Sequence, residues 1–530
     1  MARLRLAAIS VFLFVFLVIA PPPVGAGGPD KDKDKAVGPG CDPTRTAVAY
    51  HAGGPALKSH EGDLPIPCAV VAGSSMETAT VGVTSRGTLF YAPQSTGAAV
   101  PPAVFRSDDD GATWNQKTPT LQPGTGSAIP WMHVDPETNR IWFAMIGPMP
   151  SNCPTKDPAE FPNASSHTLA QITWSDDEGT TWHEPPGDPG DCRQLQGGMS
   201  VVEGPAPKGQ PQPVGYQHVV YHCGNIVDGA VPLSVHCWKS LDGGQTWSRF
   251  EAPGQNVPPP SDCTAGKYGG RGRAVGPDGT LYMSVQCPPA IPPGNGPLYL
   301  ASSRDEGNTW DYQKVVNTSY ETTEELLVSS LAVDKAGNLY ITWVDSDNHA
   351  MLIVGKGSGK GPKWDSPLNI AEPGVNFVTR DSVAVNEPGH VAVAYVGSTG
   401  GMSGTFNGYI AESKDALGAD PTFFGASVND PAEPLMSSAY ANAITAVRGR
   451  IWLLTDAFGP DGTPWAAFHC ANLTTGVTTG TPTSITCPNG APAPAAAPLA
   501  LGVVGRLASH HDDDHGKDHD SEHGHDQDHD

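Results

Sequence analysis

The sequence predicts an all-β protein built as a β-propeller, with seven blades favoured and six possible. Three observations support this prediction. An eight-residue motif, Ser-x-Asp-x-Gly-x-Thr-Trp, occurs four times, starting at residues 107, 175, 240 and 303. Patterns of two alternating strands around a short turn recur between the motifs. Glycine and proline are abundant, with 62 and 53 residues, as expected for many short strands joined by turns.

The N-terminal residues 1–26 have the features of a signal peptide. Arg3 and Arg5 precede an apolar core from Leu6 to Ala20, and Val24-Gly25-Ala26 supplies small residues for cleavage. The alternative is an uncleaved membrane anchor, but the apolar run is short for a membrane span. We therefore expect a secreted, extracellular protein, with a polar linker over residues 27–40 before the propeller.

The cysteines agree with export, because an even number in a secreted chain favours disulfides over metal ligands. Pairing between sequence neighbours would staple local loops and would make the propeller disulfide-bonded, although the sequence alone leaves the connectivity open. The neighbouring pairs are Cys41 and Cys68, Cys153 and Cys192, Cys223 and Cys237, Cys263 and Cys287, and Cys470 and Cys487.

The recurring strand–turn–strand patterns define the blades. Each has apolar residues at every second position on both sides of a short turn, which is typical of a β-hairpin. Units are predicted to begin near residues 79, 130, 200, 270, 329, 380 and 440. Strands around 45–50 and 69–72 could complete the last blade, so that no sheet edge is left exposed. The propeller is expected to span residues 41–490.

Within the motif, the Asp can accept hydrogen bonds from backbone N–H groups of the turn, the Gly permits positive φ, and the Trp can be buried between blades. Binding of calcium by the acids is the alternative, but two fixed positions supply too few oxygen ligands. The motif is therefore interpreted as structural. Degenerate copies occur at residues 357–364 and from Ser413.

These four motifs resemble the Asp-box, or BNR repeat, of the sialidase superfamily, over roughly residues 75–470. The resemblance implies a β-propeller with its functional site at one end of the central funnel. Sialidases bind the substrate carboxylate with three arginines and use a Tyr nucleophile paired with a Glu. The first of these arginines usually lies in an Arg-Ile-Pro segment, and no arginine of this chain is followed by x-Pro. Sialidase propellers also have six blades.

Candidate site residues follow from their equivalent positions, just before the core of each predicted inner strand. Tyr440 and Glu325 are the candidates for catalysis. The alternative is that these strand-end residues form ordinary ion pairs. The candidates for ligand binding are Arg271, Arg273, Arg380, Asp381 and Trp131.

The net charge of −24 argues against nucleic-acid binding, because an acidic surface repels polyphosphate. Residues 491–530 are expected to be an Ala/Pro-rich linker and a disordered His/Asp-rich tail. Neutral imidazoles of this tail could bind Zn²⁺ or Ni²⁺ weakly. We expect neither a cofactor nor a metal site in the propeller. The tail candidates are His511, His515, His519 and His523.

Two functions remain open. The first is a propeller that binds a glycan or a protein ligand at its funnel without catalysis. The second is an exo-α-sialidase-type glycoside hydrolase, so whether the protein is an enzyme is left undecided. The absence of the Arg-x-Pro segment favours the binding function.

Overall fold

The computed structural model describes residues 38–59, 63–75, 79–93, 103–119, 130–148, 168–185, 197–228, 231–251, 260–263, 267–289, 294–320, 329–357, 361–436, 455–471, 486–492 and 500–509. All of them belong to the unit that begins at Val37. Within these ranges the only helical elements are two 3₁₀ turns, η1 (Gly401–Ser403) and η2 (Pro488–Gly490). No described helix is long and apolar enough to cross a membrane.

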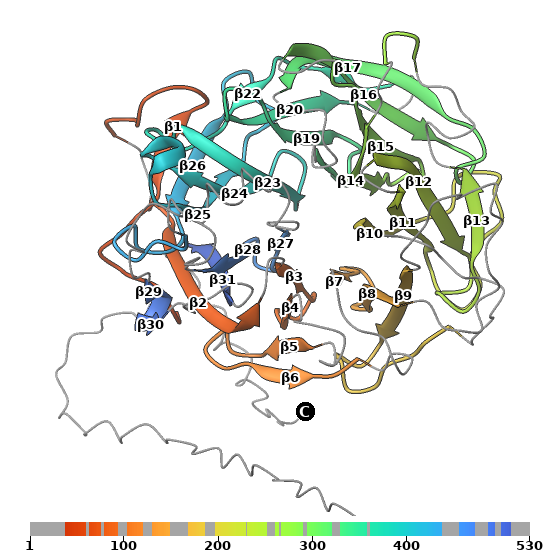
Figure 1. The fold of residues 1–530 in the computed structure, drawn as a ribbon, viewed down its shortest axis with the longest axis horizontal. Coiled ribbons are helices and arrows are strands. Elements are labelled where there is room, and N and C mark those ends of the chain that lie inside the picture. The colour runs from red at the N-terminus through yellow and green to blue at the C-terminus, as the bar shows by residue number, and fades with distance from the viewer. Residues whose placement is uncertain are drawn as a thin grey trace, which may run out of the picture. The chain divides into compact units, whose positions relative to one another are not determined.

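The described strands form seven blades, of which the first four carry the motif (Figure 1). Blade 1 contains β3 (Ala79–Val83), β4 (Leu89–Pro93), β5 (Val104–Ser107) and β6 (Asn115–Lys117). Blade 2 contains β7 (Pro130–Val134), β8 (Ile141–Pro148) and β9 (Thr168–Ser175). Blade 3 contains β10 (Gly197–Gly204), β11 (Val219–Asp228), β12 (Val231–Ser240) and β13 (Ser248–Glu251). Blade 4 contains β14 (Lys267–Val275), β15 (Leu281–Gln286), β16 (Gly294–Ser303) and β17 (Asp311–Tyr320).

The remaining three blades lack a complete motif. Blade 5 contains β18 (Ser330–Val333), β19 (Leu339–Val344), β20 (Ala350–Lys356), β21 (Lys363–Trp364) and β22 (Leu368–Asn369). Blade 6 contains β23 (Phe377–Val385), β24 (Val391–Ser398), β25 (Asn407–Ser413), β26 (Thr422–Ser427) and β1 (Val48–His51). Blade 7 contains β27 (Asp456–Phe458), β28 (Pro464–Cys470), β31 (Ala500–Ala508) and β2 (Ile66–Ser75). A small hairpin, β29 (Thr486–Cys487) with β30 (Ala491–Pro492), forms a two-stranded sheet of its own.

The innermost strands close a ring. β3 contacts β7, and contacts continue through β10, β14, β18, β23 and β27 back to β3. The antiparallel sheets therefore form the predicted seven-bladed β-propeller. Six predicted starts agree with the observed inner strands. The start near residue 440 lies outside the described residues, and the described part of blade 7 begins at β27.

Ring closure differs from the prediction in two ways. Residues 500–508, assigned from sequence to the linker after residue 490, form β31, which pairs with both β2 and β28 in blade 7. This strand is buried along nearly its whole length, so its apolar residues lie inside a blade. The strand near residue 48 joins β26 of blade 6 instead of the last blade. The N-terminal segment thus bridges two neighbouring blades.

Four of the five predicted disulfides are present, and the chain is stapled as expected. The cysteines of the fifth pair, Cys153 and Cys192, lie outside the described residues. The observed bonds join Cys41 to Cys68, Cys223 to Cys237, Cys263 to Cys287, and Cys470 to Cys487.

The four motif turns share one hydrogen-bond pattern. In the first, the Asp109 carboxylate accepts the Thr113 N–H at 2.9 Å and the Thr113 hydroxyl at 2.6 Å. Ser107 Oγ accepts the Gly111 N–H at 2.9 Å. The hydrogen bonds from Thr113 lower the pKa of Asp109. The same bonds recur at Asp177, Asp242 and Asp305. The fixed acid of the motif therefore closes its own turn.

The variable fourth position of the motif reaches the preceding blade. Its residue has positive φ in all four turns, from 55° to 66°. Where that residue is acidic it pairs with a cation of the preceding blade, and where it is Gly243 its carbonyl accepts Arg140 Nη1 at 2.7 Å. We call these contacts the motif latches. The ionic latches are Asp110 with Arg506, Glu178 with Arg86 and Arg106, and Glu306 with Lys239.

The motif glycine and tryptophan complete each junction. A Cβ on Gly307, where φ is +91°, would lie 2.1 Å from the ring of Phe250 in the preceding blade. Trp310 is buried in the cluster that holds Phe250. The other motif tryptophans are partly buried against the equivalent clusters, as predicted, and they are Trp114, Trp182 and Trp247. The motif is thus a device for joining one blade to the previous one.

Candidate functional site

The predicted ligand-binding residues that the structure describes lie on three inner strands, β7, β14 and β23. Arg273 comes from β14, Arg380 and Asp381 come from β23, and blade 5 separates these two strands in the ring. Trp131 lies on β7 and packs, partly buried, against the cluster between blades 2 and 3. The proposed roles of these residues in ligand binding remain predictions.

Arg273 is engaged inside the propeller. Only 3% of the residue is exposed, and its Nη1 donates to Ser200 Oγ of blade 3 at 2.6 Å. Burial lowers the pKa of Arg273 to about 9, which still leaves the guanidinium charged at neutral pH. This side chain therefore joins blades 3 and 4.

Arg380 and Asp381 are neighbours on β23. Arg380 Nη1 donates to the carbonyl of Thr379 at 2.9 Å. Burial lowers the pKa of Arg380, whereas the charge of Asp381 raises it. The two residues therefore place opposite charges at consecutive positions of the inner strand of blade 6.

Several other candidates cannot be placed. Tyr440, Glu325 and the four tail histidines lie outside the described residues. The side chain of Arg271 is likewise not described, although its backbone belongs to β14. The proposed roles of all of these residues stay predictions.

The sequence-based reasoning missed Asp456, the first residue of β27. Its Oδ1 accepts the hydroxyl of Ser382, on β23, at 2.6 Å. Burial raises the pKa of Asp456 to about 7, and a carboxyl that holds its proton can donate as well as accept a hydrogen bond. Its place at the end of the apolar stretch 451–454 could have marked it as an inner-strand acid.

Polar side chains on or next to the inner strands join neighbouring blades. The hydroxyls of Ser284, on the second strand of blade 4, and Ser329, just before β18 of blade 5, lie 2.5 Å apart. Thr455 Oγ1 accepts the Val81 N–H at 2.7 Å between blades 7 and 1. His133 and Glu203 form a 2.6 Å pair between blades 2 and 3. The inner strands thus concentrate hydrogen-bonding groups where the seven blades converge.

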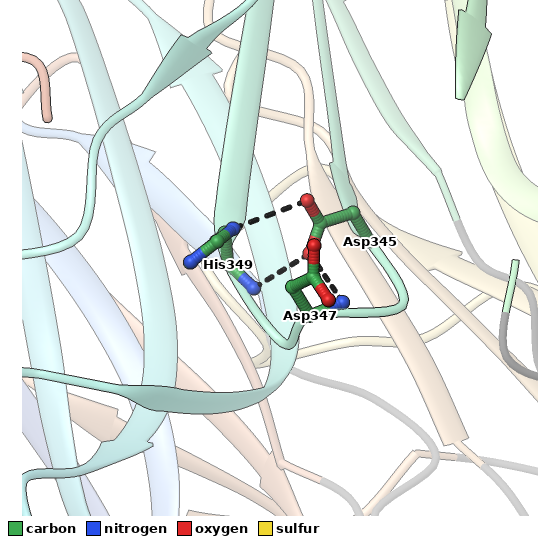
Figure 2. A group of neighbouring side chains, drawn as sticks. All are labelled: Asp345, Asp347 and His349. Carbon is green, nitrogen blue, oxygen red and sulfur yellow. Dashed lines mark hydrogen bonds and ion pairs between the residues drawn. The ribbon is translucent and has the colours of Figure 1, made fainter. Parts of the chain in front are cut away.

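One group on an outer turn has the chemistry of a cation site. Asp345, Asp347 and His349 lie on the turn between β19 and β20, and each offers one ligand atom within 4.8 Å of the others (Figure 2). Asp345 already accepts the N–H groups of Asp347 and His349 at 3.0 and 2.9 Å, and its other oxygen lies 3.2 Å from His349 Nδ1. These bonds account for the arrangement as a closed turn.

Comparison with known proteins names no family for this chain. No protein-family model matches it, and no curated protein matches it. Among solved structures it is similar to a Hadza microbial sialidase (15% identity, 70% of each chain, TM-score 0.38). It is also similar to a protein of unknown function from Dyadobacter fermentans (12%, 82% of this chain and 97% of that one, 0.38). A third is the six-bladed Aleuria aurantia lectin (11%, 67% and 96%, 0.36). The assignment of the fold rests on the strand pairing above.

Proposed function

We propose that the protein is an extracellular propeller that binds an uncharged glycan at its central funnel, through residues of the inner strands. The observation that carries this proposal is the Ser382–Asp456 pair beside Arg380 and Asp381. A sugar presents many hydroxyls, each of which must find a donor or acceptor when it loses water. The hydroxyl of Ser382 and the carboxyl of Asp456 supply both donors and acceptors. Arg380 and Asp381 add a cationic donor and an acceptor.

The ligand class follows from the charges. A sialic acid carries a carboxylate, which is best bound by guanidinium groups. Arg273 is buried against Ser200, and Arg380 lies beside an acid. The inner strands also carry Glu203 and Asp456, so the site favours an uncharged ligand. The exo-sialidase alternative is less well supported for the same reason.

Secretion is part of the proposal. The basic and apolar features of residues 1–26 and the four disulfides support removal of a signal peptide and an oxidising location. N-terminal sequencing of the exported protein should show cleavage after Ala26. The resemblance of the four motifs to the Asp-box supports the proposal that the protein is a member of the sialidase superfamily that retains the propeller.

A glycan array tests the binding proposal. The mature protein should bind neutral oligosaccharides and release nothing from a fluorogenic sialoside. The matched variants are Asp456→Leu, which removes the donor and the acceptor at similar side-chain size, and Asp311→Leu, an exposed control on β17. Loss of binding in the first variant alone supports the site. Hydrolysis of the sialoside by the wild type would establish the alternative function.

A further inference from the structure

The junction between blades 2 and 3 contains two histidine–carboxylate bridges that run in opposite directions. His133, on β7 of blade 2, binds Glu203 of blade 3 through Nε2 at 2.6 Å. His218, just before β11 of blade 3, binds Asp135 and Glu137 in the β7–β8 turn of blade 2. Both bridges depend on histidine, whose charge changes near neutral pH.

His218 uses both ring nitrogens. Its Nδ1 lies 2.9 Å from Asp135 Oδ2, and its Nε2 lies 3.1 Å from Glu137 Oε2. An ionised carboxylate only accepts hydrogen bonds, and a neutral imidazole has only one N–H. Both bonds can therefore exist together only when His218 carries a proton on each nitrogen. This requirement comes from the geometry alone.

Asp135 is the fixed end of the bridge. It is fully buried and also accepts the hydroxyl of Tyr216 and, at 2.8 Å, that of Thr138. Burial alone would raise the pKa of Asp135, but the hydrogen bonds from His218 and Tyr216 outweigh it and lower the pKa well below the usual range. Asp135 therefore stays ionised whenever His218 titrates.

The acidic side chains around His218 raise its pKa. Burial alone would lower the pKa of His218, but the hydrogen bond to Asp135 and the charges of Asp135, Glu203 and Glu137 raise it. Arg140 lies behind the ring of Tyr216, 4.1 Å from its centroid, and its charge is paired with Asp176 at 2.6 Å. The charged side chains around His218 are thus mostly acidic.

We propose that the junction between blades 2 and 3 is a pH-sensitive joint, closed while His218 holds both ring protons and loosened when it loses one. The neutral ring keeps its proton on Nδ1, toward Asp135, and presents a lone pair to Glu137. The Glu137 side chain is 69% exposed and turns into solvent. The released proton goes to water, and the β7–β8 turn loses one of its attachments to blade 3.

The sign of the effect follows from the raised pKa. The stabilisation is complete below the ordinary histidine pKa of about 6.5 and is lost as the pH rises through the higher pKa of the folded state. Amide hydrogen exchange in β7 and β11, corrected for the intrinsic pH dependence, should therefore accelerate as the pH rises above the ordinary histidine pKa and through the higher pKa of the folded state.

The variant Glu137→Gln tests the joint at an exposed position. Its amide can accept from or donate to His218, so a second ring proton is no longer required. The His218 pKa should fall by about half to one pH unit, and the pH-dependent acceleration of exchange should be lost, because the neutral ring can accept the amide N–H at Nε2. The matched control is Glu387→Gln, in the equivalent turn of blade 6, where the acid pairs with Lys335 at 2.7 Å. The control should leave both quantities unchanged.

Nitrogen-15 NMR of the histidine rings gives the direct test in the wild-type protein. The ring whose signals move in Glu137→Gln, and not in Glu387→Gln, is His218. Protonation of both of its nitrogens at pH 7 supports the proposal. A neutral ring at pH 7, or the same titration in Glu137→Gln as in the wild type, would overturn it.

Discussion

The motif turns and the inner strands use acidic residues in opposite ways. In the motif turns every fixed Asp accepts bonds from its own turn, and where the next residue is acidic it pairs with a cation of the preceding blade. On the inner strands, Asp456 is held by a serine hydroxyl and burial raises its pKa to about 7. The acids of the repeated motif form ion pairs or turn hydrogen bonds. Asp456, which belongs to no repeat, has a raised pKa and can hold its proton closer to neutral pH. The repeated acids therefore hold the turns and the blades together, and an inner-strand acid outside the repeat marks the candidate site.

The largest loss of stability among the predicted changes is expected at the motif latch between blades 3 and 4. Lys239→Met removes the cation 2.6 Å from Glu306, whose side chain is only 1% exposed. A buried charge without its partner costs about 3–5 kcal/mol, and denaturant unfolding measures this loss. The control is Arg86→Met, because Arg86 is 63% exposed and Glu178 keeps Arg106; that change should cost less than about 1 kcal/mol. Equal losses would contradict the assignment of the latches.

The motif glycine gives the next largest effect. Gly307→Ala places a methyl group 2.1 Å from the Phe250 ring at a φ of +91°. Backbone strain and overpacking together should cost about 3 kcal/mol. Gly209 has nearly the same φ, +89°, with no atom near the added Cβ. Gly209→Ala should therefore cost only about 1 kcal/mol. A similar cost at both sites would show that contact with the preceding blade is unimportant.

Removing the inner-strand charge should have a smaller and opposite effect. Because the pKa of Asp456 is about 7 in the folded state and about 3.9 when unfolded, the unfolded chain releases its proton first. Wild-type stability therefore falls as the pH rises from about 4 to about 7. Asp456→Asn keeps the bond to Ser382 and should be more stable than wild type by a few kcal/mol at pH 8, with no difference at pH 4. Asp311→Asn, on the surface, should follow the wild-type profile.

The sequence predicted the scaffold well because the scaffold repeats. The motif spacing and the hairpin patterns predicted seven blades and the inner strands of the first six, and the even cysteine count predicted local disulfides. The strand at residues 500–508 was missed because closing the ring uses a segment far from its partners, and an Ala/Pro-rich stretch precedes it. Chain closure is set by long-range pairing, which has no local signal.

The site was predicted less well because its residues do not repeat. Equivalent positions pointed to Arg273, Arg380 and Asp381, but whether a guanidinium faces a ligand or a neighbouring blade depends on three-dimensional packing. Burial against Ser200 turned Arg273 into a joint between blades. Asp456 is one acid among 55 acidic residues, and only its burial and its contact with Ser382 distinguish it.

The most direct test of whether the motif acids hold the blades together while Asp456 binds the ligand is one glycan-array measurement on three proteins: the wild type, Asp456→Leu and Glu178→Gln. Glu178 belongs to a motif latch, where Arg106 lies 2.7 Å away. The wild type and Glu178→Gln should bind the same neutral oligosaccharides, and a folded Asp456→Leu, which lacks the donor and the acceptor, should bind none. Binding that survives in Asp456→Leu but is lost in a folded Glu178→Gln would contradict this assignment of roles.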